Sequence, residues 1–169
     1  MKKKLLALIL CLVMVASAIA TVGVSADDAA GYTLDEQTKT FTVTTADGLV
    51  AVAALINAGK LDHNVTLAAD IDMAGKKWTP IGTSNEPFKG VFDGGNFTIK
   101  NLENIVTHEM TGAAGYCGLI GKAYDGVVVK NLWLVDANLQ GVEFTGAIIG
   151  ETAQESADNT ERKVVIENV

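Results

Sequence analysis

Cysteine is nearly absent from this chain. It has two cysteines, Cys11 and Cys117, and Cys11 lies in an apolar N-terminal segment that we expect to be removed. One remaining thiol excludes a disulfide framework within the mature chain. Because no histidine or second cysteine lies near Cys117 in the sequence, we interpret it as a structural thiol rather than as a nucleophile.

Basic side chains are also scarce. The 13 lysines and arginines are outnumbered by 20 aspartates and glutamates, and the only arginine is Arg162. Three of the lysines lie within the first 26 residues, so the remainder has 10 basic and 20 acidic side chains and a net charge of −10. Nucleic-acid phosphates require clustered lysine and arginine. We therefore expect no nucleic-acid partner.

Few residues are suited to catalysis or metal binding. His63 and His108 lack metal-ligand spacing, and we expect both at the surface. Asp70 and Asp72 are spaced like calcium ligands, but two carboxylates are too few for an ion that takes about six to eight oxygens. A glycosidase would need two aligned carboxyl groups. We therefore predict no catalytic residue, no metal, no cofactor and no enzyme activity in this segment.

The first 26 residues have the features of an export signal. Lys2, Lys3 and Lys4 precede the apolar stretch 5–20, and Val24-Ser25-Ala26 forms a cleavage-site pattern before Asp27. An uncleaved anchor helix is the alternative, since about 20 apolar residues span a bilayer. The small residues at the cleavage site favour removal. We expect a secreted or cell-surface protein with no membrane insertion after cleavage.

Three segments near the middle of the chain resemble one another at nearly constant spacing. Their first residues lie 28 and then 29 positions apart. The segments are Gly90-Val91-Phe92-Asp93, Gly118-Leu119-Ile120-Gly121 and Ala147-Ile148-Ile149-Gly150. Each is followed by an aliphatic residue, a charge, an asparagine and another aliphatic, at 99–102, 129–132 and 166–169. Such a repeat of short strands predicts a solenoid.

In a solenoid, the same position of every coil stacks on its own copy. The predicted aliphatic columns are Val91, Leu119 and Ile148; Phe92, Ile120 and Ile149; and Ile99, Val129 and Ile166. Asparagine is unfavourable inside strands but adopts turn conformations readily. We expect Asn101, Asn131 and Asn168 to mark corners and to form a ladder of side-chain amides. Three unrelated surface turns are the alternative.

These motifs give the chain a family resemblance. It resembles the bacterial surface proteins with the GLUG motif, a Gly-Leu-hydrophobic-Gly tetrapeptide that residues 118–121 match fully and residues 147–150 match without the first glycine. The segments 67–73, 78–82 and 88–94 resemble the stretch that precedes such repeats, so the likeness covers roughly residues 40–169. It implies an all-β fold, a right-handed parallel β-helix of the pectin-lyase-like kind.

Residues 27–63 are expected to close the first coil of residues 64–169. A strand pair is predicted at 32–34 and 39–44, followed by a helix that Thr45 or Asp47 caps and Gly59 ends. The apolar side of this helix consists of Leu49, Val52, Ala53 and Ile56. A terminal coil needs a cover for its apolar face, so we interpret the helix as that cap. A helix that binds a partner is the alternative.

Two aromatic residues are candidates for ligand binding. Trp133 lies on the opposite parity from Leu132 and Leu134, hence facing outward, and Tyr124 precedes the same coil in an expected loop. Exposed aromatic rings stack on sugars and anchor protein contacts. Packing of Trp133 beneath a neighbouring loop is the alternative. The polar insert 151–163 is expected to be a loop bulging from a coil.

The sequence ends at Val169 within an aliphatic strand without a closing element. We expect continuation in a longer chain or end-to-end self-association, because solenoids require caps. The function predicted from these features is adhesion or recognition of an extracellular glycan or protein. The alternatives are the N-terminal segment of a carbohydrate-active enzyme, such as a polysaccharide lyase or glycosidase, and a structural spacer that binds nothing.

Overall fold

The computed structural model describes residues 24–27, 30–107, 115–154 and 163–169. Strands dominate these residues, and the expected mostly β class is confirmed. The first 23 residues of the predicted export signal lie outside the described residues, as do His108 and Arg162. Within the described ranges, no helix has the length and hydropathy needed to cross a membrane.

The fold begins with three antiparallel strands. β1 (Val24–Asp27) pairs with β2 (Tyr32–Asp35), which pairs with β3 (Thr40–Val43), so the predicted strand pair is confirmed. In the turn between β2 and β3, the Asp35 carboxylate accepts hydrogen bonds from the backbone N–H groups of Thr38 and Gln37. These bonds lower the pKa of Asp35. The predicted cleavage point after Ala26 lies inside β1.

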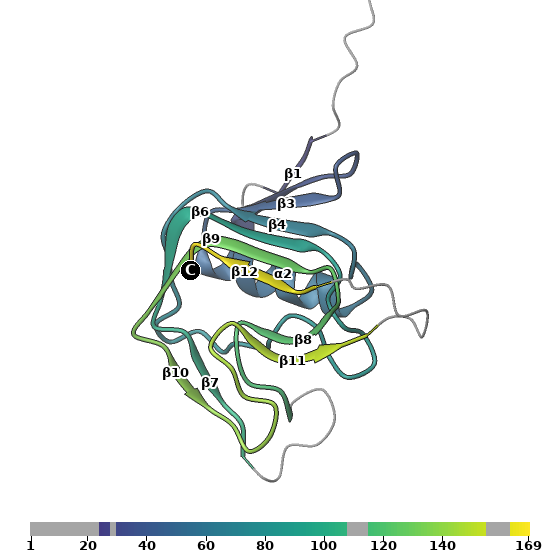
Figure 1. The fold of residues 1–169 in the computed structure, drawn as a ribbon. Helices are drawn as coiled ribbons and strands as arrows, with labels where there is room; N and C mark the ends of the chain where they lie inside the picture. The colour runs from purple at the N-terminus through teal and green to yellow at the C-terminus, as the bar shows by residue number, and fades with distance from the viewer. Residues whose placement is uncertain (1–23, 28–29, 108–114, 155–162) are drawn as a thin grey trace, which may run out of the picture.

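Helix α2 (Ala46–Asn57) follows β3, where the apolar periodicity predicts it. Thr45 caps its N-terminus, since the Thr45 hydroxyl accepts a hydrogen bond of 3.0 Å from the N–H of Gly48. After Ala58, Gly59 adopts a positive φ of 123° and ends the helix. The predicted apolar side is buried: Leu49, Val52, Ala53 and Ile56. The helix contacts β2 and β3, and Figure 1 shows it behind the main sheet.

The main sheet is parallel from β3 onward. Its order continues through β4 (Asn64–Leu67), β6 (Val91–Lys100), β9 (Val128–Val135) and β12 (Val165–Glu167), while the short β5 (Ile71–Asp72) also pairs with β6. Successive registers align one inward column: Phe41, Val65, Phe92, Val129 and Ile166. The first four of these side chains are fully buried. Burying each one contributes about 1.5–3 kcal/mol.

Two smaller parallel sheets complete the architecture. β7 (Glu103–Ile105) pairs with β10 (Asn138–Gln140), and β8 (Ile120–Tyr124) pairs with β11 (Ile149–Ala153). Three consecutive strands, one in each of these sheets, make up what we call a pass of the chain. Strands β6, β7 and β8 form one pass, and β9, β10 and β11 form the next. Figure 1 shows the smaller sheets below the main one.

The predicted aliphatic columns are confirmed in part, since Val129 lies beside Ile166. Phe92 and Ile99 lie outside their predicted columns, because similar sequences occupy different sheets. Ile120 of the GLUG tetrapeptide aligns with Ile149, as predicted, but its other neighbour is Ile81 rather than Phe92. Phe92 belongs to the main sheet, where its partner Val129 lies 37 residues later and Ile166 another 37 residues later. The loops between the sheets differ in length. Residues that stack in the structure are therefore not the residues that lie 28 or 29 positions apart in the sequence repeat.

The three predicted corner asparagines have the expected turn conformation, but they do not form one row. Asn101, Asn131 and Asn168 have positive φ values of 54°, 52° and 54°. Asn131 and Asn168 stack at one corner of the main sheet, whereas Asn101 ends β6 and pairs with Asp72 through a 2.8 Å hydrogen bond. The asparagines therefore belong to two rows instead of the predicted single ladder. Asn131 lies at the bend within β9, whereas Asn101 lies just after the end of β6.

Candidate functional site: a groove beside strand β7

A groove of about 780 Å³ lies between residues 74–80 and strand β7. Residues 74–80, which we call the strap, form one wall. The other wall consists of Asn101, strand β7, Asp136 and Asn138. Its volume lies within the range of about 300–1,000 Å³ that is usual for ligand pockets.

The strap is fastened to helix α2 rather than to β7. Near its start, the Lys76 ammonium pairs with the Asp47 carboxylate at 2.6 Å. At its end, the Asn57 amide donates to the carbonyl oxygen of Pro80 at 2.9 Å and accepts from the N–H of Gly82 at 2.7 Å. Asp47 and Asn57 are ten residues apart, about 15 Å along the helix. The bonds of Asn57 thus hold the end of the strap against the helix, and the solvent-exposed Lys76–Asp47 pair adds a weaker contact near its start.

The Gly118 peptide joins the inner sides of the two walls. The buried Trp78 of the strap donates a 3.0 Å hydrogen bond from Nε1 to the carbonyl oxygen of Gly118. The buried Asn104 of β7 accepts a 3.2 Å bond at Oδ1 from the N–H of the same glycine. Both side chains thus satisfy their polar groups in the interior. The first glycine of the GLUG tetrapeptide therefore helps to build the groove.

The outer face of β7 and β10 carries a row of polar side chains. Asn138 donates a 3.2 Å hydrogen bond from Nδ2 to Glu103, and its Oδ1 accepts a 2.9 Å bond from Gln140. Glu103 and Asn138 are exposed and occupy equivalent positions on paired strands. At the adjoining corner, hydrogen bonds from the Asn101 amide and the Ala74 N–H lower the pKa of Asp72.

Charges of both signs surround the groove. Lys76 and Lys77 belong to the strap, whereas Glu103 and Asp136 lie on the opposite side. Lys76 is engaged by Asp47, so Lys77 is the strap cation for which no partner is recorded within the described residues. The described part of the chain contains no group of three or more acids, histidines or cysteines that could hold a metal ion. The groove can thus offer amides, carboxylates and an ammonium group to a ligand.

The predicted aromatic residues lie elsewhere. Trp133 faces outward from β9 with 52% of its surface exposed, so its predicted orientation is confirmed. Tyr124 ends strand β8 instead of lying in a loop, and the Lys89 ammonium is 4.6 Å from the centre of its ring. Trp133 belongs to β9 and Tyr124 lies four residues before the start of this strand, and neither residue lines the groove. The structure therefore does not combine them into one site.

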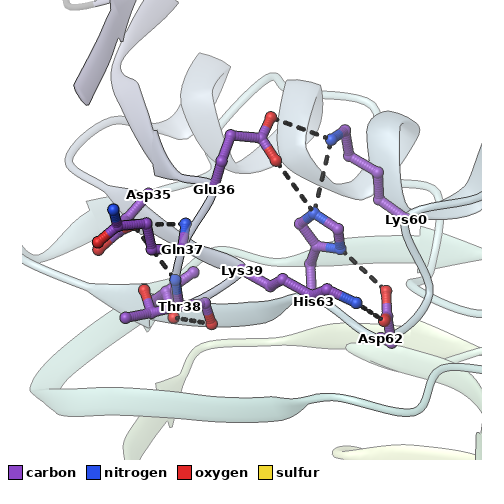
Figure 2. A network of polar contacts seen from close by, with 9 residues as sticks. Asp35, Glu36, Gln37, Thr38, Lys39, Lys60, Asp62 and His63 are labelled. Atoms are coloured by element: carbon purple, nitrogen blue, oxygen red, sulfur yellow. Dashed lines mark hydrogen bonds and ion pairs between the residues drawn. The ribbon is translucent and has the colours of Figure 1, made fainter. Parts of the chain in front are cut away.

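His63 is buried, and its predicted surface position is wrong. Only 7% of it is exposed, and its ring centre lies 5.5 Å from that of Phe41. Figure 2 shows the imidazole between the Asp62 carboxylate, 3.1 Å from Nδ1, and a pair formed by Lys60 and Glu36. Strand β3 supplies Phe41 as apolar cover, a contact between distant residues that the local polar sequence does not reveal.

Cys117 is a buried thiol beside the groove wall. Its Sγ donates a 3.2 Å hydrogen bond to the carbonyl oxygen of Asn104. Burial raises the pKa of this thiol. Because nucleophilic cysteines require an accessible thiolate, the position agrees with the structural interpretation.

Sequence reasoning did not find the groove, although a faint signal existed. Asn101 and Asp136 each come directly after a strand, β6 and β9 respectively. Glu103 lies two residues after Asn101, and Asn138 lies two residues after Asp136. Asp136 also has the positive φ of a corner residue, 52°. These residues form a second repeat, at other positions than the GLUG tetrapeptides. It corresponds to the pairing of Glu103 on β7 with Asn138 on β10.

Comparison with known proteins gives two likenesses. No family model matches the chain. Halomucin of Haloquadratum walsbyi is 35% identical over 120 residues, which cover 63% of this chain and 1% of halomucin. The chain therefore spans about a hundredth of the length of this curated relative.

The second likeness is structural. A Bacteroides ovatus protein described as a "putative immunoglobulin A1 protease" has a crystal structure that superposes with a TM-score of 0.57 at 21% identity. The superposition covers 76% of this chain and 36% of that chain. At this level of identity, the likeness concerns the fold alone.

Proposed function

We propose that this chain is a β-helix module, exported or displayed at a bacterial cell surface, that recognises a glycan or a protein through the groove beside β7. The observation that carries the proposal is the groove itself. It has the volume of a ligand site, two walls fixed by separate elements, and polar groups of several kinds facing one space.

The right-handed β-helix is part of this proposal. Support comes from the parallel register of β4, β6, β9 and β12 and from the two smaller parallel pairs that the same passes form. The GLUG resemblance agrees with it. In such a solenoid, α2 would act as the N-terminal cap.

An extracellular location is supported by two independent features. The chain begins with the pattern of an export signal, and the matched stretch of 120 residues is similar to part of halomucin. The mature chain would have one cysteine and therefore no internal disulfide to form during export.

We propose binding without chemistry at this groove. The two carboxylates that line it, Glu103 and Asp136, are both exposed to solvent. A glycosidase acid depends instead on a desolvated environment that keeps it protonated. Cys117 is buried and does not line the groove.

A pair of arrays, one of glycans and one of peptides, tests the proposal with the purified chain. We expect binding on one of them that the double variant Glu103→Ala/Asn138→Ala loses. The matched control is Trp133→Ala, which removes an exposed side chain outside the groove and should leave binding unchanged. Circular dichroism would verify that both variants fold.

Two results would contradict the proposal. Loss of binding in Trp133→Ala, with binding retained in the double variant, would place recognition on the outer face of β9. No binding by the wild-type chain on either array would favour the structural spacer.

A further inference from the structure

Among the residues that the structure describes, strand β7 is hydrogen-bonded along one of its edges. In its parallel pairing with β10, the N–H of Asn138 donates to the carbonyl of Leu102, and the N–H of Val106 donates to the carbonyl of Gln140. Because backbone groups alternate in direction along a strand, Leu102, Asn104 and Val106 face β10. The N–H and C=O groups of Glu103 and Ile105 therefore point away from β10.

The edge formed by Glu103 and Ile105 faces the groove, and no strand of the described ranges pairs with it. The preceding pass stays in register with the sheets up to Met73, whose N–H donates to the carbonyl of Lys100. It rejoins them at Ile81, whose N–H donates to the carbonyl of Leu119. Between these points runs the strap, and no hydrogen bond to the backbone of Glu103 or Ile105 is recorded within the described residues.

The strap cannot fill this position while it remains fastened to α2. The contact of Asn57 with Pro80 holds its end, and the solvent-exposed pair of Lys76 with Asp47 adds a weaker contact near its start. The buried Trp78 fixes its middle through the bond to Gly118. The groove is thus the place of a missing strand, bounded by a fixed loop on one side and a free strand edge on the other.

We propose that an extended polypeptide segment of a partner protein binds in the groove by adding a strand to the free edge of β7. This inference rests on the proposed function and names the class of ligand. Two donors and two acceptors, repeated every second residue, complement another extended backbone. Addition of a strand to an unpaired sheet edge is an established mode of peptide recognition.

The charges around the groove select among such segments. An incoming strand presents every second side chain on the outer face that carries Glu103. Asp136 and Lys77, which are also exposed, line the same groove. Segments with side chains of both charges fit this arrangement better than segments of one sign.

Backbone hydrogen exchange measures the free edge directly. In the unbound protein, the amide hydrogens of Glu103 and Ile105 should exchange faster than those of Asn104 and Val106, which β10 protects. A bound strand should slow exchange at Glu103 and Ile105 and leave Asn104 and Val106 unchanged. Equal protection of all four amides before binding would overturn the inference.

Peptides selected from a displayed random library on the full chain provide the probe. The variant Ile105→Pro removes the donor that points into the groove, and proline is tolerated where a strand N–H faces solvent. Ile105→Ala is the matched control, since it changes the same side chain and keeps the donor. We expect Ile105→Pro to weaken peptide binding about tenfold and Ile105→Ala to change it far less.

A second measurement leaves the protein unaltered. Methylation of alternate backbone nitrogens in the peptide should abolish binding in one register and spare it in the other, because only one set of N–H groups pairs with β7. Peptide binding that neither Ile105→Pro nor methylation of the peptide weakens would overturn the proposed strand addition. Binding of an oligosaccharide, lost in Glu103→Ala/Asn138→Ala, would also overturn it while upholding the proposed function of the groove.

Discussion

The side-chain amide of Asn168 donates a 2.9 Å hydrogen bond to the side-chain oxygen of Asn131 in the pass before it. Asn131 in turn donates a 3.1 Å bond to Asp93, one pass earlier still. This row links three successive strands of the main sheet at one corner. Although partial burial opposes it, hydrogen bonding from Gly95, Asn131 and Lys130 lowers the pKa of Asp93, so the row ends on a carboxylate.

Two substitutions at Asn131 should separate the role of its conformation from that of its hydrogen bonds. Asn131→Gly keeps access to the positive φ of 52° but removes both bonds, which we expect to cost about 1–2 kcal/mol. Asn131→Ala removes the same bonds and adds the strain of a left-handed backbone, about 1 kcal/mol more. Urea unfolding measures both. Equal losses would show that the corner conformation carries no cost.

The sequence predicts the local elements of this fold well. Alternation in residues 39–44, the apolar spacing of Leu49 to Ile56 and the caps at Thr45 and Gly59 are all confirmed, because each depends on neighbours within a few residues. The stacking of the passes is predicted less well. Gly90 and Gly118 begin similar tetrapeptides yet lie in different parts of the pass, since unequal connections shift the register.

The repeat of Asn101 and Asp136 points to the paired strands beside the groove. The groove itself depends on a strand position that the described residues leave unfilled, and no sequence pattern marks such a gap. Gly75 and Pro80 indicate a break in strand structure, but they do not show where the segment lies. Its position depends on contacts with Asp47 and Asn57, about 20 to 30 residues earlier. The same limitation explains His63. Its neighbours in sequence are polar, but its burial comes from Phe41 on another strand.

The Lys122–Glu151 pair predicts a specific dependence of stability on pH. These side chains face each other across β8 and β11 at 3.0 Å and are 16% and 26% exposed. The bond to Glu151 raises the pKa of Lys122. Burial acts against ionisation of Glu151, but hydrogen bonds from Lys122 and Tyr116 lower its pKa below the ordinary 4.5. A lowered carboxylate pKa contributes stability that is present above 4.5 and lost as the pH falls.

Unfolding midpoints in urea at pH 7, 5 and 3.5 test this contribution. The stability difference between wild type and Lys122→Met should be largest at pH 7 and shrink toward pH 3.5, because the contribution of an ionised Glu151 is lost progressively below 4.5. Glu151→Gln should flatten the wild-type pH dependence in the same interval. A difference between wild type and Lys122→Met that grows on acidification would contradict the assigned pairing.

The first glycine of the GLUG tetrapeptide should be intolerant of a side chain. Gly118 has a φ of +147°, and a Cβ there would lie 2.4 Å from the carbonyl oxygen of Gly146, which is rigid backbone. We expect Gly118→Ala to destabilise the chain by about 2 kcal/mol or more, through steric overlap and backbone strain. The matched control is Gly115→Ala, where no atom lies within 4 Å of the added carbon. Comparable losses of thermal stability in the two variants would refute this role.

Cys117 offers a readout of opening at the wall of the groove. Its thiol is buried, burial raises its pKa, and its hydrogen bond to the Asn104 carbonyl ties it to β7. Alkylation by iodoacetamide at pH 8 should therefore require local or global unfolding, and its rate should follow the urea transition. A selected peptide that adds a strand to β7 should slow alkylation further, because it stabilises the closed state. Rapid alkylation in the absence of urea, measured by mass spectrometry, would show that the thiol is accessible in the native fold.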